Sequence, residues 1–316
     1  MAKLSAAGDH LWTRQFEGHD AIPYAVDLAP NGEISVSGRY MDDALDFGGG
    51  PLPPASSAAT FVARLDAAGE HLWSRGFPGL QPGESESLGL AVNAAGQTAV
   101  EVTYSGSIDL GGGPHVSHGG TDIAVAVFEP DGAYRWSGSW GGPKAGNLHE
   151  RIGGLVLDDA GRVFLSGKFE DVINFGGGPL VSAGEDDLFV AAFDADGAHR
   201  WSRRFGDADS QGGGQLAFGD DGVLRLLGGG SGVLALDDVV MQLADPALFL
   251  ARLTQEGTFT AAQTITTGSV NVRPLAVDPC GDILLAGMFW RDVTIGGFVH
   301  SNPDQLPDGF VAKFRP

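Results

Sequence analysis

Acidic, basic and polar residues recur at one place in the sequence, just ahead of five regularly spaced apolar segments that each end in a turn glycine. Twelve positions before those glycines stand Asp20, Glu84, His149, Ser210 and Ser269. Two positions later stand Ile22, Glu86, Arg151, Gly212 and Asn271. Side chains that vary on a repeating frame are typical of a binding pocket on a symmetric scaffold, and ordinary solvated loop residues are the alternative.

The carboxylates of this set suggest one specific chemistry. Glycoside hydrolysis needs a proton donor and a second carboxylate about 5 to 10 Å away. Asp20, Glu84 and Glu86 are the candidates, with His149 and Glu150 as neighbours. A chain with 40 acidic residues brings carboxylates together by chance, so we favour a non-enzymatic site and keep catalysis as the alternative.

Residues 207–212, DADSQG, place oxygen-bearing side chains at alternate positions before a glycine, as calcium loops do. The ligands would be Asp207, Asp209 and Gln211. The bidentate glutamate of such loops is missing, because Phe218 stands at the twelfth position. We therefore expect no cofactor, with weak calcium binding as the alternative to a flexible acidic loop.

Histidine and tryptophan give two further candidates. His115 and His118 would form a zinc site only if His149 converged on them, and solvated loop histidines are the simpler interpretation. Trp290 stands outside the repeat pattern, so we expect it to be partly exposed at a binding surface. The candidate ligand-binding set is therefore Asp20, Glu84, Glu86, His149, Arg151 and Trp290.

The elements that must position these residues repeat along the chain. Tryptophans separated by 61, 63 and 65 residues mark four copies: Trp12, Trp73, Trp136 and Trp201. Each copy contains two apolar alternations around a glycine turn, a bridge such as DFGGGPL, a third alternation and the tryptophan strand. The triple glycines complete no nucleotide-binding motif and are interpreted as tight backbone crossings. Four short antiparallel strands in each repeat of about 60 residues predict a β-propeller blade.

The two ends of the chain predict how a ring of blades closes. Residues 1–8, MAKLSAAG, match residues 62–69, VARLDAAG, and the C-terminal FVAKFRP matches the start of that same strand. The last blade then lacks a tryptophan strand, which HLWTRQF near the N-terminus supplies. We expect an all-β, five-bladed β-propeller with four antiparallel strands per blade, closed by an N-terminal strand that completes the C-terminal blade. This is a single domain over 1–316, with repeats at roughly 9–69, 70–132, 133–197, 198–257 and 258–316.

The ordered motifs W…F, xAxDxxGxxxxxG, DFGGG and GxxDxFVAxxDxxG are most complete from Trp136 to Gly197. They resemble the bacterial β-propeller repeats often labelled SBBP, over nearly the whole chain. The fourth copy departs by losing DFGGG, and the second has Val102 where others carry glycine. The family's name refers to seven blades, and five repeats are counted here. The resemblance implies a propeller, often in exported or surface-associated bacterial proteins, and implies no reaction.

Composition excludes several partners. The chain has 19 basic and 40 acidic residues, a formal charge of −21, and no run of basic residues forms a phosphate-binding stripe, so we expect no nucleic-acid binding. The single cysteine, Cys280, rules out an internal disulfide framework. No apolar run approaches the ~20 residues that span a bilayer, and the N-terminus lacks a signal-peptide pattern, so we expect no membrane insertion.

These observations favour a non-enzymatic binding or scaffold propeller, monomeric by default, that engages a glycan or protein partner through loops on one face. One alternative is a glycosidase-like enzyme that uses carboxylates at the channel mouth. A second is a structural module of a larger surface protein. The family resemblance suggests an exported or cell-surface location.

Overall fold

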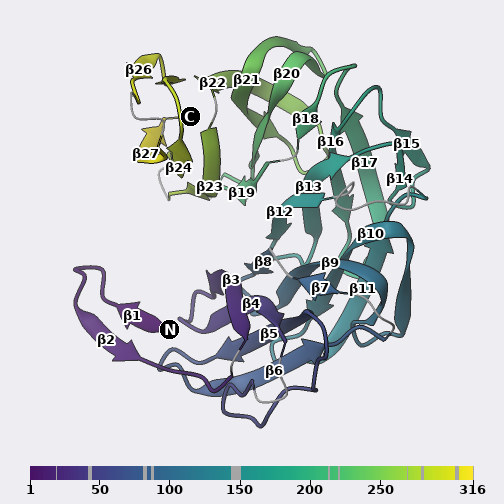
Figure 1. The fold of residues 1–316 in the computed structure, drawn as a ribbon, viewed down its shortest axis with the longest axis vertical. Helices are drawn as coiled ribbons and strands as arrows, with labels where there is room; N and C mark the ends of the chain where they lie inside the picture. The colour runs from purple at the N-terminus through teal and green to yellow at the C-terminus, as the bar shows by residue number, and fades with distance from the viewer. Residues whose placement is uncertain are drawn as a thin grey trace. The chain divides into compact units, whose positions relative to one another are not determined.

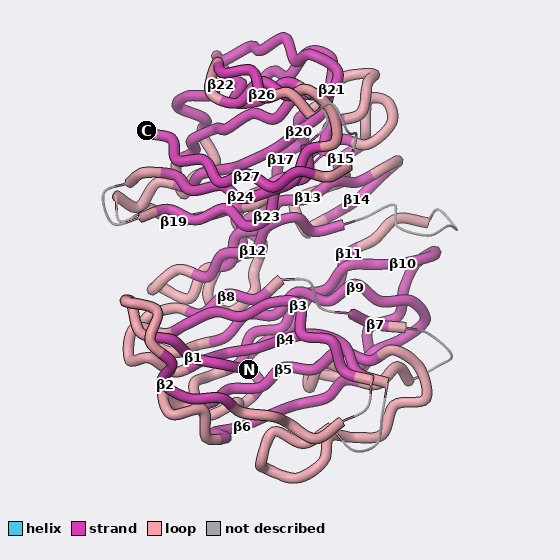
Figure 2. The backbone as a smooth tube through the Cα atoms, turned by 60° about the vertical axis from the view of Figure 1, so that its left-hand side comes forward, coloured by secondary structure: helices cyan, strands magenta, loops and turns pink. Residues whose placement is uncertain are grey.

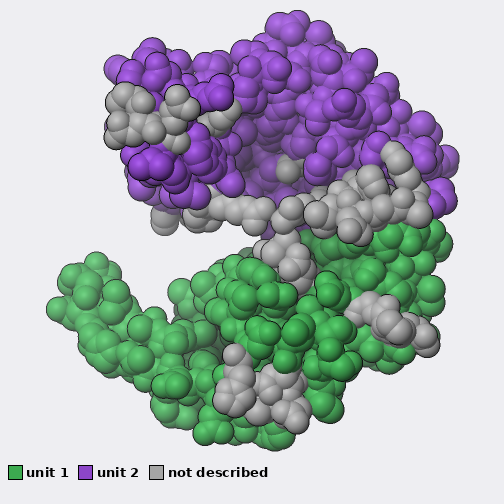
Figure 3. Space-filling model, viewed as in Figure 1, with its two compact units in different colours: residues 1–140, 145–147, 157–161 green, residues 141–144, 148–156, 162–316 purple. Residues whose placement is uncertain are grey.

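The computed structural model describes residues 1–18, 20–41, 45–80, 84–86, 89–143, 151–212, 214–219, 221–268, 270–278, 281–302 and 306–315. These residues form strands and connecting loops (Figures 1 and 2). They contain no helix with the length and apolarity needed to cross a membrane. The chain divides into two compact units, which are described separately (Figure 3).

Unit 1 comprises residues 1–140, 145–147 and 157–161 and contains two sheets of four or more strands. In blade A each strand pairs with the next: β3 (Ala21–Leu28), β4 (Ile34–Tyr40), β5 (Ala59–Leu65) and β6 (His71–Phe77). Blade B pairs two short strands with the first arm of a long hairpin: β7 (Ser85–Glu86), β8 (Leu90–Val92), β9 (Thr98–Asp109), β10 (Pro114–Phe128) and β11 (Tyr134–Trp140). A separate hairpin precedes both: β1 (Ala2–Leu4) and β2 (His10–Thr13).

Unit 2 comprises residues 141–144, 148–156 and 162–316 and continues the pattern. Blade C is β12 (Arg151–Leu157), β13 (Val163–Phe169), β16 (Asp187–Phe193) and β17 (His199–Phe205), with the hairpin β14 (Val172–Asn174) and β15 (Pro179–Val181). Blade D is β18 (Gln211–Gly212), β19 (Leu216–Phe218), β20 (Leu224–Leu236), β21 (Val239–Leu253) and β22 (Phe259–Thr267), extended by β25 (Val293–Ile295) and β26 (Phe298–His300). Blade E is β23 (Val270–Val277), β24 (Ile283–Phe289) and β27 (Asp308–Phe314).

The described chain is therefore an all-β protein of propeller-type blades, as the repeats predict. Four repeats form sheets with all four strand positions filled, and the fifth has three strands among the described residues. The predicted turn glycines have positive φ values of 71° to 85°, at Gly32, Gly96, Gly161, Gly222 and Gly281. Glycine is needed there because other residues are strained at positive φ.

Each triple-glycine bridge passes over the aromatic side chain that begins the tryptophan strand, which is His71, Tyr134 or His199. Asp46 Oδ1 accepts hydrogen bonds from Gly48 N (2.6 Å) and Gly50 N (3.0 Å), which curls the bridge. A Cβ at the middle residue, Gly49, would overlap the imidazole of His71. The same overlap recurs in blades B and C, at Gly112 with Tyr134 and at Gly177 with His199. This confirms the prediction of tight backbone crossings.

The tryptophans pack one blade against the next within each unit. In unit 1, Trp73 of blade A lies 5.9 Å from Phe128 of blade B between ring centroids, and its Nε1 donates to Pro130 O (3.0 Å). In unit 2, Trp201 of blade C donates from Nε1 to Gln255 O of blade D (2.9 Å). The repeated tryptophan therefore serves packing between blades.

Candidate functional site

The residues twelve positions before the turn glycines occupy equivalent places in the fold. In three repeats the main-chain carbonyl at this position accepts a hydrogen bond from the same point of the second arm, which lies just past β4 in blade A and within β9 and β20 in blades B and D. The donor and acceptor pairs are Met41 N to Asp20 O (2.9 Å), Ser105 N to Glu84 O (3.0 Å) and Ser231 N to Ser210 O (3.2 Å). The main chain at this position is therefore held by the sheet, whereas the side chains of Asp20 and Glu84 are exposed.

The next residue along the chain holds two blades together. Ser85 N donates to Ala58 O (2.8 Å), and Ser85 Oγ accepts from Thr60 N (2.9 Å) of blade A. In unit 2, Gln211 N makes the corresponding bond to Asp186 O (2.7 Å). The backbone next to the candidate positions is thus held by a residue that sequence reasoning passed over.

The remaining members of the predicted ligand-binding set are placed as follows. Glu86 ends β7 opposite Thr103, and Arg151 begins β12, with only their backbones described. Trp290 follows β24 and is 36% exposed. His149 lies outside the described residues. Within unit 1, Asp20 directly precedes β3 of blade A, and Glu84 and Glu86 lie on either side of Ser85 at β7 of blade B. Trp290 belongs to unit 2.

One basic residue of this region was missed from the sequence. Arg39 lies on β4 directly opposite Ile22, the second candidate position of the first repeat. Its Nε is buried and has no hydrogen-bond partner in the described structure. The available sequence signal was its place directly after Gly38, where the third repeat carries Lys168 after Gly167. Arg39 offers a cation beside Ile22 in a chain that is otherwise rich in acid.

The residues considered for calcium form a hydrogen-bonded turn. Gln211 is buried, its Oε1 accepts from Asp207 N (2.9 Å), and its Nε2 donates to Asp207 Oδ1 (2.7 Å). Asp207 also accepts from Val233 N (2.6 Å) and Asp209 N (3.0 Å), and these backbone bonds lower the pKa of its carboxyl. Over the described ranges, no three His, Cys, Asp or Glu side chains are grouped to hold a metal ion. Calcium binding here would have to replace existing hydrogen bonds.

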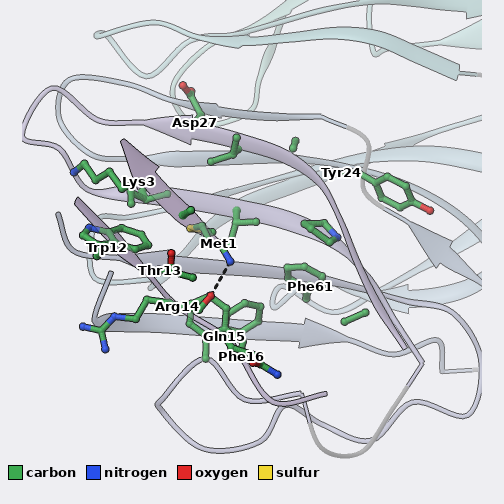
Figure 4. Close-up of a pocket in the computed structure, with 18 of the residues that line it drawn as sticks. Met1, Lys3, Trp12, Thr13, Arg14, Gln15, Phe16, Tyr24, Asp27 and Phe61 are labelled. Atoms are coloured by element: carbon green, nitrogen blue, oxygen red, sulfur yellow. Dashed lines mark hydrogen bonds between the residues drawn. The ribbon is translucent and has the colours of Figure 1, made fainter. Parts of the chain in front are cut away.

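A cavity of about 1050 Å³ lies in unit 1 between the β1–β2 hairpin and the outer face of β3. Its lining is mostly apolar and aromatic, and Figure 4 shows Trp12, Phe16, Tyr24 and Phe61 around it. Val26 of β3 is 65% exposed on this side, whereas its counterpart in blade D, Leu216, is 7% exposed. The cavity therefore exposes a face that is buried in a complete repeat; we call it the β2–β3 groove.

The N-terminal segment contacts blade A as the last strand of a preceding blade would. Trp12 Nε1 donates to Ala67 O (3.2 Å), as Trp73 does to Pro130 O in blade B. Further along, Glu17 pairs with Asp46 in an isolated bridge, as Gly79 pairs with Ile108. In the groove, β2 thus takes the place that the fourth strand of a preceding blade would take. Apart from β1, the described residues provide no inner strand of such a blade.

One titratable group of this groove is perturbed. Asp27, on β3, accepts from Val92 N (2.8 Å) of blade B and from Leu28 N (2.8 Å). Burial raises the pKa of its carboxyl above the ordinary value of 3.8, and the two backbone hydrogen bonds oppose that rise. Asp27 therefore joins blades A and B from within the groove.

No family model matches the sequence, and no curated protein matches it. Two solved structures show a distant likeness. One is a puromycin hydrolase mutant complexed with PGG, 16% identical, with 88% of this chain and 38% of that chain covered and a TM-score of 0.45. The other is a Synechocystis apocarotenoid oxygenase mutant, 10% identical, with 93% and 82% covered and a TM-score of 0.32. The chain spans little more than a third of the hydrolase, and neither likeness assigns a function.

Proposed function

We propose that this protein is a non-enzymatic binding or scaffold propeller that engages a glycan or protein through its interblade and bridge loops. The observation that carries the proposal is the repeated hydrogen bond beneath Asp20, Glu84 and Ser210, which fixes their backbones while their side chains differ. The exposed Asp20 and Glu84 carboxylates and the cation of Arg39 supply polar contacts in unit 1. Trp290 is the aromatic candidate of unit 2.

The test separates binding from turnover. Glu84→Gln and Glu86→Gln keep side-chain size and remove the charge, and each is assayed on a glycan array and for glycan hydrolysis. Glu256→Gln, in the turn between the third and fourth strands of blade D, is the matched control. Reduced glycan binding with no hydrolysis by the parent protein supports the proposal. Hydrolysis that disappears while binding is kept would establish the glycosidase-like alternative instead.

For the architecture we propose a five-bladed ring, closed when β2 adds to the edge of β27 in blade E that has no partner among the described strands. The contacts of Trp12 and Glu17 with blade A support this proposal, because they are those of a fourth strand. Exposure of β27 supports it too: Val311 is 80% exposed, whereas Val62 and Val190 at the same repeat position are 0% exposed.

Amide hydrogen exchange tests closure. In a closed ring every amide of β27 lies in a ladder, so residues 309–314 are protected throughout. The edge strand β26 (Phe298–His300) serves as the internal reference for a strand with one free edge. Exchange at alternate residues of β27, as expected for β26, would contradict closure.

A further inference from the structure

Blade C contains an ion pair at the start of its third strand. Lys168 of β13 donates from Nζ to Oδ2 of Asp186 (2.5 Å), which directly precedes β16. The two side chains are 35% and 24% exposed, so solvent reaches the pair. Across the sheet, Lys168 lies opposite Leu188, an apolar residue that is fully buried. Blade C thus supplies its own carboxylate to the cation at this position.

Blade A has the cation of this pair and lacks the carboxylate. Arg39 lies opposite Thr60, in the same register as Lys168 and its cross-strand partner. Two residues before Thr60, Ala58 stands where blade C has Asp186. The carbonyls of Ala58 and Asp186 accept equivalent hydrogen bonds from the next blade (2.8 and 2.7 Å), so the two positions correspond in space as well. A methyl group therefore stands in blade A where blade C has the carboxylate.

Two polar groups at this point of blade A have no hydrogen-bond partner among the described residues. One is Arg39 Nε, which is buried, and the other is the hydroxyl of Thr60, whose side chain is fully buried. Because directly opposed residues have Cβ atoms about 5 Å apart on one face of a sheet, both groups can donate to one acceptor. Buried donors without an acceptor are costly, so an acceptor supplied by a ligand would bind favourably here.

The surrounding groups restrict the kind of acceptor. A carboxylate fits, because an arginine guanidinium binds carboxylates with paired hydrogen bonds and blade C has a carboxylate in the equivalent place. Asp20 directly precedes β3, and Glu84 directly precedes the serine that accepts a hydrogen bond from Thr60 N. Their exposed carboxylates repel a ligand with many negative charges and accept hydrogen bonds from hydroxyl groups. The site therefore suits a single carboxylate surrounded by hydroxyls.

We propose that Arg39 and Thr60 form a carboxylate subsite, and that the glycan bound by the interblade and bridge loops contains uronic acid. The sugar carboxylate takes the place beside Ala58 that the Asp186 carboxylate fills in blade C. Arg39 and Thr60 donate hydrogen bonds to it, and the ring hydroxyls of the sugar donate to the neighbouring carboxylates. This inference rests on the glycan binding proposed above and adds the chemical class of the sugar.

Nuclear magnetic resonance of the Arg39 Nε–H group measures the binding. The full chain is titrated with methyl galacturonate, with methyl galactoside as the neutral sugar, and with propionate as a carboxylate without hydroxyls. We expect a saturable shift of the Arg39 resonance with galacturonate, and at least tenfold weaker binding of the other two probes. Arg39→Lys identifies the resonance, because lysine has no guanidinium.

Three substitutions test the geometry. Ala58→Asp restores the carboxylate of blade C, so it should pair with Arg39 and weaken galacturonate binding at least tenfold. Ala58→Asn has the same size without the charge and should weaken it by less than threefold. Thr60→Val removes one hydrogen bond to the ligand and should weaken binding about fivefold. Its melting temperature should not fall, because the hydroxyl has no partner in the described protein, and this separates lost binding from lost folding.

The outcomes separate this inference from the proposed function. An Arg39 resonance that galacturonate does not move, or equal binding by the parent and Ala58→Asp, would overturn the carboxylate subsite. Equal binding of propionate and galacturonate would overturn the assignment to a sugar and indicate a carboxylate of a protein partner. Binding of neutral glycans on the array with no response at Arg39 would overturn this inference alone. An array on which no glycan binds would overturn glycan binding itself.

Discussion

The junction between blades A and B and the groove between β2 and blade A use the same outer contacts and differ in what lies inside them. At the junction, Trp73 reaches Pro130 O, and Val62 of β5 is buried against blade B. At the groove, Trp12 reaches Ala67 O, but among the described strands the inner position is held by β1 alone. The tryptophan contact therefore forms without the core that it normally encloses. What distinguishes a complete blade junction is the third strand.

The largest effect should come from placing a charge at the third-strand position. Val190→Asp, in the core of blade C, is expected to cost about 4 kcal/mol because an unpaired carboxylate is buried. Val311→Asp should lower the free energy of unfolding by about 2 kcal/mol if blade E completes the groove. If Val311 stays exposed, the change should be smaller than about 0.5 kcal/mol. Denaturant unfolding of both variants gives the comparison, and a neutral Val311→Asp would count against closure.

A smaller effect is expected at the tryptophans. Trp73→Ala should lower the free energy of unfolding by about 3 kcal/mol, because a buried ring leaves a cavity beside Phe128. Trp12→Ala should cost about half as much, since Trp12 is only half-buried. Equilibrium denaturation of the two variants measures both losses. Equal losses would mean that the groove is as completely packed as the junction.

The smallest effect concerns Asp27 and pH. Burial raises the pKa of Asp27 in the folded protein, so the ionised carboxyl lowers stability at neutral pH, and that loss disappears as pH falls through the raised pKa towards 3.8. Asp27→Asn should therefore gain stability relative to the parent as pH rises through this window, and the gain should level off above it. Unfolding free energies of the two proteins between about pH 3 and pH 7 test it. A difference that is constant across this range would exclude ionisation of Asp27 as its cause.

Much of the fold could be predicted from the sequence because its determinants are local. Gly32 and its counterparts mark the hairpin turns, and strand alternation gives the order of strands in each blade. The continuous hairpins of blades B and D were not foreseen: β9 and β10 run through the bridge of the second repeat, as do β20 and β21 in the fourth. The bridge residues that form these longer strands do not alternate regularly between apolar and polar side chains. Their sequence therefore did not distinguish a strand from a loop.

The candidate site was less predictable because its contacts join residues far apart in the chain. The repeat spacing placed Asp20 and Glu84 at equivalent positions, and the hydrogen bonds of their carbonyls agree with that. Ser85 looked like an ordinary loop residue, since its role as a clasp depends on Ala58 and Thr60 in the preceding blade. Whether the ligand-binding set holds a glycan or a protein stays a prediction, as does calcium at Asp207, Asp209 and Gln211.

Calcium provides a direct check on that last residue group. A ligand that binds only the folded state must raise stability. Because the Asp207 and Gln211 side chains are already hydrogen-bonded to each other, we expect the melting temperature to be unchanged by calcium or chelator. A rise with calcium that Asp209→Asn abolishes would show that the turn opens to bind metal.

Ring closure is tested most directly by oxidising the Thr13→Cys/Ala312→Cys protein in the Cys280→Ser background. The pair Ala63→Cys/Ser74→Cys, which joins β5 and β6 in known register, is the positive control. Closure predicts a disulfide in the monomer at a yield close to the control, with the shift in mobility reversed by reductant. A monomer that stays reduced, or a disulfide found only between chains, would contradict the closed five-bladed ring.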